Sequence, residues 1–273
     1  MYISQMYIHP VKSFGGIAVE QFEVDCFGPR WDRRWMVVDP QGKFITQRQC
    51  VEMAAIDVEF MEGRVVLTGA EGSTVAFTPE DFAAGESIEA RVWRDQVQAR
   101  LGPQWLEQWL THELGRPCNL VFMPEQSQRK VDPNYAKRDE TVSFADGFPL
   151  LLTSQASLDF LNSKMSIAIT QSRFRPNLVV EAAQPWQEDN WKRIRVGAME
   201  FEVVKPCSRC VIPTIDPSSL KKQPEVFNTL KQYRSQGGEV FFGQNLIPII
   251  PPGHNPKAAI GEIHCSDKLV VLE

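Results

Sequence analysis

Residues 199–210 read MEFEVVKPCSRC. The segment begins with alternating apolar and acidic side chains, and this period of two predicts a half-buried β-strand. Pro206 and the Asp216-Pro217 step then interrupt regular structure, so we expect Cys207 and Cys210 to lie on a loop where the strand ends. The rest of the chain is interpreted from this loop.

Cys210 directly follows Arg209, and a nearby positive charge favours an ionised thiol. Thiolates are soft ligands for transition metals. The spacing of Cys207 and Cys210 leaves three interpretations. A structural zinc site needs two further ligands, and the downstream histidines and cysteine do not stand at a recognised spacing. A thioredoxin-like redox pair belongs at the start of a helix, whereas here a strand leads into the motif. In the third interpretation one thiolate ligates the metal of a cofactor and the other thiol supports it.

Composition places the chain among soluble globular proteins. Of its 273 residues, 43% are hydrophobic and 23% are charged, which allows one large or two ordinary domains. The net charge of −5 argues against a nucleic-acid or membrane-surface role. We find neither a signal peptide nor an apolar run long enough to span a membrane, so we expect a cytoplasmic protein. The four isolated cysteines are expected to be reduced, small buried hydrophobes: Cys26, Cys50, Cys118 and Cys265.

The predicted secondary structure differs between the two halves of the chain. Residues 1–120 read mostly as short strands separated by glycine and proline, which suggests a barrel or a strongly twisted β domain. Within this part, tryptophans and leucines recur at helical spacing over 105–114, and we expect both Trp105 and Trp109 to pack in the core. Residues 124–140 are polar and mark a domain boundary or a long surface loop. The second half predicts further strands, helices after Ser154 and over 225–234, and a proline-rich loop at 248–256.

Several cations stand at predicted turns or strand ends rather than on long solvated helices. Arginine can grip a phosphate through two parallel hydrogen bonds, and lysine adds a point charge. Together with nearby hydroxyl and amide side chains they suit an anionic ligand, and they predict a local basic pocket in an acidic protein. The residues are Lys12, Arg33, Arg175 and Arg209, with Ser13, Asn177 and Ser208.

At this point the sequence resembles a known family. The segments PVKS at 10–13, WDRRW at 31–35, FRPN at 174–177 and CSRC at 207–210 are similar, in the same order, to the MOSC superfamily with its N-terminal β-barrel domain. Its members include the mitochondrial amidoxime-reducing components and related bacterial proteins. The resemblance implies a β-rich α+β fold with two domains: an N-terminal β-barrel-like domain at 1–122, and a MOSC β-barrel domain with short helices at 123–273.

The resemblance also implies a molybdenum cofactor, in which a pterin dithiolene carries the metal and a phosphate. Cys210 matches the metal ligand and is therefore the expected catalytic residue. The seven residues of the predicted basic pocket match positions that hold the pterin and its phosphate. Further matches are Asp146, Gly147, Phe148 and Asn245, the last at a position where some relatives have tyrosine.

The activity implied by the resemblance is reduction of an N–O bond in a small N-hydroxylated compound. The sequence contains no ferredoxin-type cysteine pattern, so the electrons are expected from a separate protein, ferredoxin-like or cytochrome-like with its reductase. The alternative is a module that binds and hands on the cofactor or sulfur without its own turnover, because MOSC domains also end the enzymes that sulfurate this cofactor. Metal content and amidoxime turnover distinguish the two.

Overall fold

The structure is a computed structural model. It describes residues 1–182, 184–251, 253–255 and 258–273. The predicted loop at 248–256 lies partly outside these residues, since 252 and 256 are not described. Its first residue, Pro248, ends a strand rather than starting the loop.

The largest sheet has nine strands among the described residues, in the order β19-β14-β15-β17-β12-β13-β1-β2, with β16 paired to β17. Among the described strands of this sheet, β12 and β13 alone pair in parallel, through a crossover that contains a helix. The bounds are β1 Tyr2–Ile8, β2 Ile17–Ala18, β12 Leu150–Ser154, β13 Leu178–Glu181, β14 Arg193–Val196, β15 Met199–Ser208, β16 Ser235–Gln236, β17 Glu239–Pro248 and β19 Leu269–Val271.

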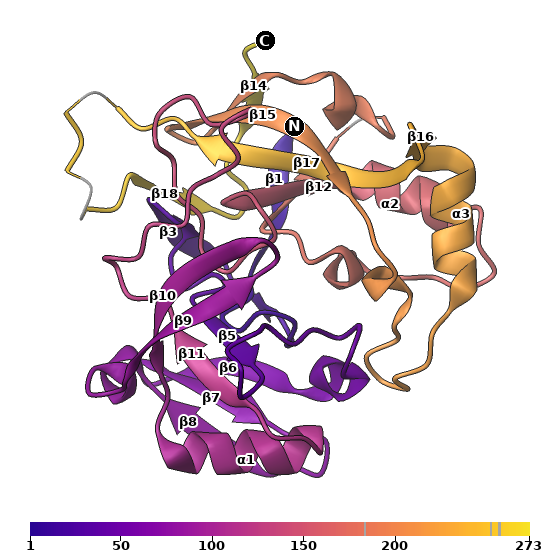
Figure 1. Ribbon diagram of the computed structural model, residues 1–273. Coiled ribbons are helices and arrows are strands. Elements are labelled where there is room, and N and C mark those ends of the chain that lie inside the picture. The colour runs from indigo at the N-terminus through magenta and orange to yellow at the C-terminus, as the bar shows by residue number, and fades with distance from the viewer. Residues whose placement is uncertain (183, 252, 256–257) are drawn as a thin grey trace.

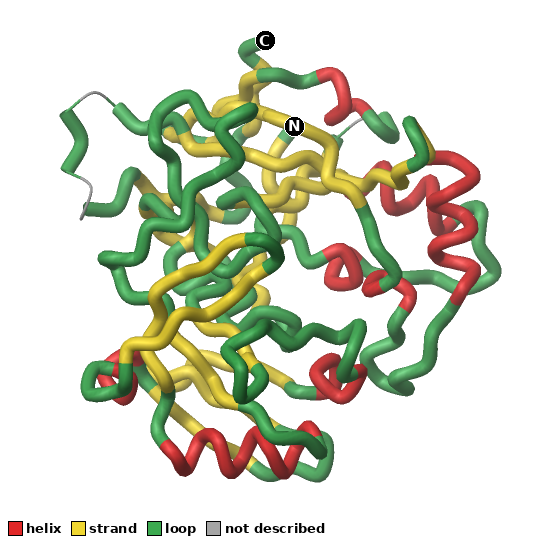
Figure 2. Tube along the Cα trace, viewed as in Figure 1, coloured by secondary structure: helices red, strands yellow, loops and turns green. Residues whose placement is uncertain are grey.

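Three smaller sheets complete the strand pattern. Their orders are β5-β11-β10-β9, β6-β7-β8 and β18-β3-β4. The bounds are β3 Gln21–Asp25, β4 Gly28–Pro29, β5 Trp35–Val38, β6 Asp57–Met61, β7 Arg64–Thr68, β8 Thr74–Phe77, β9 Ser87–Val92, β10 Asp95–Leu101, β11 Asn119–Phe122 and β18 Gly261–His264. The predicted strand-rich α+β class is confirmed (Figure 2).

Strands from the two halves of the chain pair with one another in shared sheets. β1 pairs with β13, and β3 pairs with β18, so the first strands of the chain lie in sheets of the C-terminal half. In Figure 1, β1 accordingly lies in the part of the molecule that holds β12 and β17, which belong to the same sheet, and away from β6, β7 and β8. The boundary between residues 122 and 123 stays a prediction. The consequence for the site is that the loop after β1 reaches the C-terminal half.

Short helices cover the ends of the sheets. α1 Gln104–Leu114 lies at the end of the molecule farthest from β14 and β15, while α2 Gln155–Asn162 and α3 Pro224–Arg234 lie side by side near β17 (Figure 1). The predicted cap of α2 is confirmed, because the Ser154 hydroxyl accepts a hydrogen bond from the Ser157 N–H. The described 3₁₀ turns are η1 Val51–Ala55, η2 Pro79–Phe82, η3 Gln171–Phe174, η4 Gln187–Asn190 and η5 Ile212–Thr214. No helix among the described residues is both long and apolar enough to cross a membrane.

The core prediction for the tryptophans of α1 was wrong for Trp105, whereas Trp109 packs against the core. The buried face of α1 consists of Leu106, Leu110 and Leu114, whereas Trp105 is 43% exposed. Trp109 is half-buried, and its indole N–H donates to the Ser73 hydroxyl at 3.0 Å. The leucines alone satisfy the period of 3.6, and the indoles flank that stripe because they are one position away from it.

The aromatic centre of the N-terminal half is Trp35. It is fully buried, and the rings of Phe77, Phe82 and Phe122 surround it at centroid distances of 5.2 to 6.4 Å. Aromatic pairs at such distances contribute beyond their buried area. This core fixes β5, and the backbone of Trp35 receives and donates hydrogen bonds to the loop that carries Lys12. The core of one half thus positions a residue of the site.

Candidate functional site

A cavity of about 1480 Å³ lies between the two halves of the chain. Segments far apart in the sequence line it: the loop after β1, the hairpin tip between β9 and β10, the segment before β12, and the loop after β15. The structure brings every predicted site residue to this one cavity. They are Lys12, Ser13, Arg33, Asp146, Gly147, Phe148, Arg175, Asn177, Ser208, Arg209, Cys210 and Asn245.

The cavity is basic although the chain carries a net charge of −5. Among its lining residues cations outnumber the carboxylates, which are Asp95, Asp132, Asp146 and Glu239. The cations are Lys12, Arg33, Lys43, Arg48, Arg94, Arg129, Lys130, Arg175, Lys205 and Arg209. The predicted basic pocket is therefore present, and such a pocket concentrates anions.

The two thiols occupy different structural positions, which corrects the sequence prediction. β15 continues through Pro206 and Cys207 to Ser208, so only Cys210 lies on the loop. Two register shifts against β17 flank Pro206, and the last residue of β15 that pairs with β14 is Glu202, opposite Arg193. Beyond Glu202 one edge of β15 is free of β14, and a proline without an N–H is tolerated there.

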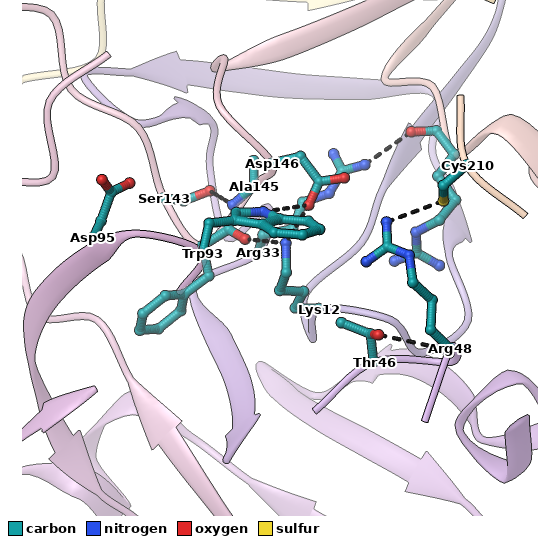
Figure 3. Close-up of polar contacts among 12 residues, drawn as sticks. Lys12, Arg33, Thr46, Arg48, Trp93, Asp95, Ser143, Ala145, Asp146 and Cys210 are labelled. Carbon is teal, nitrogen blue, oxygen red and sulfur yellow. Dashed lines mark hydrogen bonds and ion pairs between the residues drawn. The ribbon is translucent and has the colours of Figure 1, made fainter. Parts of the chain in front are cut away.

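The arginine beside Cys210 in the sequence is not its partner. Arg209 donates through Nη1 to the Sγ of Cys207 at 3.0 Å, and through Nη2 to the carbonyl of Phe174 at 2.8 Å. Cys210 instead receives a hydrogen bond from Nη2 of Arg48 at 3.0 Å, and Figure 3 shows this guanidinium directed at the sulfur. The backbone N–H of Ile212 is 3.5 Å from the same sulfur. An arginine of the N-terminal half thus donates a hydrogen bond to the thiol of the C-terminal half.

Lys12 is buried and forms two short hydrogen bonds. Its Nζ donates to Oδ1 of Asp146 at 2.6 Å and to the carbonyl of Phe144 at 2.7 Å. Burial lowers the pKa of Lys12 to about 8, against the opposing attraction of Asp146. Burial would raise the pKa of Asp146, but the charge of Lys12, with Arg48 and Arg33 nearby, holds it well below its ordinary value. The pair is therefore ionised at neutral pH.

Arg33, Asn177 and Arg175 form one connected group. Arg33 donates to the carbonyl of Arg175 at 2.8 Å, to Oδ1 of Asn177 at 3.2 Å, and to the buried carboxylate of Asp32. Arg175 in turn donates to the carbonyl of Phe14. Burial, together with the charge of Arg33, lowers the pKa of Arg175 to about 9. Two guanidinium groups are thus held close together at a cost in free energy, which an anion would offset.

Three predicted binding residues have left-handed backbone conformations. The φ angles are +70° at Ser13, +49° at Arg33 and +57° at Arg175. Such angles are uncommon for residues other than glycine, asparagine and aspartate, and they cost free energy at each position. Strained backbone of this kind clusters at functional sites, so its presence at three lining residues supports a binding role for this wall.

Two buried guanidinium nitrogens have no hydrogen-bond partner within the part of the chain that is described: Nη2 of Arg175 and Nε of Arg209. Buried N–H groups are almost always paired in folded proteins. Both residues line the cavity, and both carry positive charge. An anionic ligand in the cavity would supply the missing acceptors.

Sequence comparison agrees with this geometry. Residues 1–117 match the model of the MOSC N-terminal beta barrel domain, and residues 139–268 match that of the MOSC domain. A mitochondrial amidoxime-reducing component 1 from Danio rerio is 30% identical over 243 residues, which covers 85% of this chain and 74% of the relative. The chain belongs to the MOSC-domain family. The N-terminal barrel predicted from the resemblance is confirmed by the first match.

Two further relatives show the range of this family. The mitochondrial amidoxime-reducing component 1 of Mus musculus is 29% identical over 242 residues, covering 85% of this MOSC chain and 71% of the relative. A molybdenum cofactor sulfurase of Oryza sativa subsp. japonica is 26% identical over 263 residues, covering 89% of the chain but 32% of the relative. The same domain pair therefore occurs in proteins named for different activities.

Sequence reasoning missed several residues of this MOSC site. Arg48 follows the polar stretch after β5, and Trp93 is at a hairpin tip, where neither periodicity nor spacing marks a functional residue. Arg129 is buried, and it donates to the carbonyl of Ser143 at 2.7 Å and to Asp95 at 2.8 Å. It thereby fixes the segment that carries Asp146. Only the positive charge of these arginines was available as a signal, and it does not separate them from surface arginines.

Other predicted residues play smaller parts in the geometry. Asn245 lines the cavity, and its amide nitrogen donates to the carbonyl of Lys205 at 3.2 Å. The ring of Phe148 packs edge-on against Tyr135 at a centroid distance of 5.6 Å. Ser208 is exposed at the end of β15, where its hydroxyl is accessible from the cavity. Among the described residues no group of three or more His, Cys, Asp or Glu side chains gathers in a metal-binding cluster.

Proposed function

We propose that the chain is a molybdenum-cofactor-dependent oxidoreductase that reduces N–O bonds of N-hydroxylated compounds, with electrons from a separate donor protein. One observation carries the proposal. The half-buried thiol of Cys210 opens onto the same cavity as Arg175 and Arg209, whose buried N–H groups lack acceptors. A soft metal ligand and unused anion donors in one cavity match the two ends of a metal-carrying, phosphorylated cofactor.

The residues present fit such a group. Cys210 would ligate the metal, because it is the thiol of the pair on the loop and Cys207 is held in β15. Lys12, Arg33 and Arg175 would hold the phosphate, with Ser13, Ser208 and Arg209 as further donors. Asp146, Gly147, Phe148, Asn177 and Asn245 would complete the cofactor pocket. When bound, the cofactor supplies the two-electron redox chemistry.

The chain's own residues then bind and orient the substrate. Arg48 places N–H donors beside the Cys210 sulfur, where they can bond the oxygen of an N–OH group. The cavity reaches solvent on the side of the exposed residues Arg48 and Trp93, which gives the substrate a route to the thiol loop. Ferredoxin-like or cytochrome-like proteins with their reductase are the proposed donors, and a cytoplasmic location without a membrane span or nucleic acid is part of the same proposal.

The test combines metal analysis with turnover. Freshly purified protein should contain molybdenum, and with a reduced viologen dye as the electron donor it should convert benzamidoxime to benzamidine. If the protein contains molybdenum, shows no turnover and transfers the cofactor to an acceptor apoprotein, it is a cofactor carrier and not an enzyme. Protein that never acquires molybdenum in a host that makes the cofactor would contradict both.

A further inference from the structure

Trp93 has an unusual backbone conformation. It is the first residue of the two-residue turn that joins β9 to β10, where Val92 pairs with Asp95. Its φ angle is +55°, and Arg94, the second turn residue, does not share the positive φ. Glycine is the usual residue at a left-handed first position of a tight hairpin turn. A bulky aromatic residue in this conformation is an outlier that calls for a functional explanation.

The indole of Trp93 is directed into the cavity rather than into a core. It is 42% exposed, and its ring lies over the guanidinium of Arg48, 4.8 Å from Cζ to the ring centroid. Phe44 supports the ring at a centroid distance of 5.0 Å, and the indole N–H donates to Oδ1 of Asp146 at 3.3 Å. Figure 3 shows Trp93 above Lys12, close to Asp146. These contacts hold the ring in place but leave much of its surface free.

Arg48 connects this indole to the thiol loop. The guanidinium that lies against Trp93 donates to the Cys210 sulfur at 3.0 Å. The guanidinium has five N–H donors in all, and the sulfur uses one of them. A ligand beside Cys210 therefore meets a flat apolar surface and a cationic donor at the same place.

We propose that Trp93 and Arg48 form a substrate subsite that selects N-hydroxylated compounds whose N–O group is conjugated to a planar aromatic ring. The inference rests on the proposed function. The aromatic ring stacks on the exposed part of the indole, and Arg48 donates to the oxygen of the N–OH group. An aliphatic compound gains the hydrogen bond but not the stacking.

The depth of the residues assigns this subsite to the substrate and not to the cofactor. Lys12 and Ser13 are 5% and 7% exposed, and with the half-buried Arg175 they form the deeper wall of the cavity, which suits an anion held permanently. Arg48 and Trp93 are exposed, although Trp93 lies close to Lys12 and Asp146. A substrate that must enter and leave from solvent meets these two residues first.

Binding of two amidoximes tests the subsite without turnover. Dissociation constants of benzamidoxime and acetamidoxime are measured by calorimetry on the purified, cofactor-loaded protein with no electron donor. Trp93→Ala should weaken benzamidoxime binding about tenfold, the size expected for a lost aromatic stack, and change acetamidoxime binding less than about twofold. Trp93→Phe should restore most of the preference. Trp93→Gly suits the left-handed backbone, so it keeps the fold and should behave like Trp93→Ala.

Trp105→Ala is the matched control, because Trp105 is 43% exposed on α1 and does not line the cavity. It should bind both amidoximes as the wild type does. Equal losses for the two ligands in Trp93→Gly, or no loss, would overturn the subsite, as would wild-type protein that binds neither ligand at millimolar concentration. The proposed function has a separate outcome. If the protein never reduces benzamidoxime but binds it with a preference that depends on Trp93, the proposed function is refuted and the subsite is supported. Turnover with no dependence of KM on Trp93 refutes the subsite alone.

Discussion

The side chain of Lys12 spans the two halves of the sequence to meet Asp146, with 2.6 Å between Nζ and Oδ1 (Figure 3). Lys12 is in the loop after β1, and Asp146 precedes β12. The lysine is almost fully buried, whereas the carboxylate is largely exposed to the cavity. The lysine therefore has one anionic partner on the protein and can accept a second from a ligand.

This arrangement predicts that anion binding weakens above pH 8. The pKa of Lys12 is about 8, below its ordinary value, because burial disfavours the charged form. Protonated Lys12 attracts an anion, so affinity is highest below this pKa and falls as the proton is lost; about one tenth of the lysine stays charged one pH unit above it. Sulfate is a suitable probe because its charge is constant in this range. Its dissociation constant should rise severalfold between pH 7 and pH 9.5.

Two variants control for other groups that titrate. Lys12→Met should bind sulfate more weakly and lose the step near pH 8, which leaves only the loss of affinity near pH 9 that belongs to Arg175. Asp146→Asn removes the carboxylate that raises the pKa of Lys12, so its step should move to lower pH. A wild-type profile that is flat up to pH 9.5 would exclude Lys12 from anion binding.

The different environments of the two thiols predict different effects of their removal. Cys210→Ser should lower molybdenum content and amidoxime reduction at least about 100-fold, because serine replaces the proposed metal ligand. Its melting temperature should stay close to that of the wild type, since this sulfur is only half-buried and is bonded to an exposed arginine. Cys207→Ser changes a contact with Arg209 and should cost less than about tenfold. Equal losses in both would show that the sulfurs act as a pair.

Arg175 is predicted to matter for the ligand and not for the fold. Arg175 is half-buried beside Arg33, and its buried Nη2 has no hydrogen-bond partner among the described residues. Removing a buried charge under repulsion offsets the loss of the hydrogen bond to Phe14. Arg175→Ala should therefore change the free energy of unfolding of metal-free protein by less than about 1 kcal/mol, measured in urea. Molybdenum occupancy after purification should fall, and unchanged occupancy would remove Arg175 from the binding set.

Local sequence patterns were sufficient to predict helices and strands whose hydrophobic residues follow one regular spacing. The helix after Ser154 with its hydroxyl cap and the helix over 225–234 follow from neighbouring residues, and both are present as α2 and α3. β15 was cut short in the prediction, because a proline normally ends a strand, whereas Pro206 is tolerated where β14 no longer pairs.

The site shows where such reasoning stops. The family motifs predict a shared pocket for Lys12, Arg33, Arg175 and Cys210, and all four line one cavity. The partner of Cys210 could not be found in this way, because Arg48 is 162 residues away in sequence and reaches the sulfur only through the packing of the two halves. Arg209 is a neighbour of Cys210 in sequence only, because its guanidinium donates to Cys207 instead.

Asn177 is the predicted binding residue whose mutation should affect stability most. It is fully buried, and its Oδ1 accepts hydrogen bonds from Leu151 N at 3.1 Å and from Arg33 at 3.2 Å. Its Nδ2 donates to the carbonyl of Tyr7 at 3.2 Å, so the amide joins β12 to the end of β1. Asn177→Ala leaves buried backbone groups unpaired and should lower the free energy of unfolding by about 2–4 kcal/mol, seen as a lower urea midpoint at constant m. A loss of molybdenum in this variant at unchanged stability would instead show that the amide acts on the ligand directly.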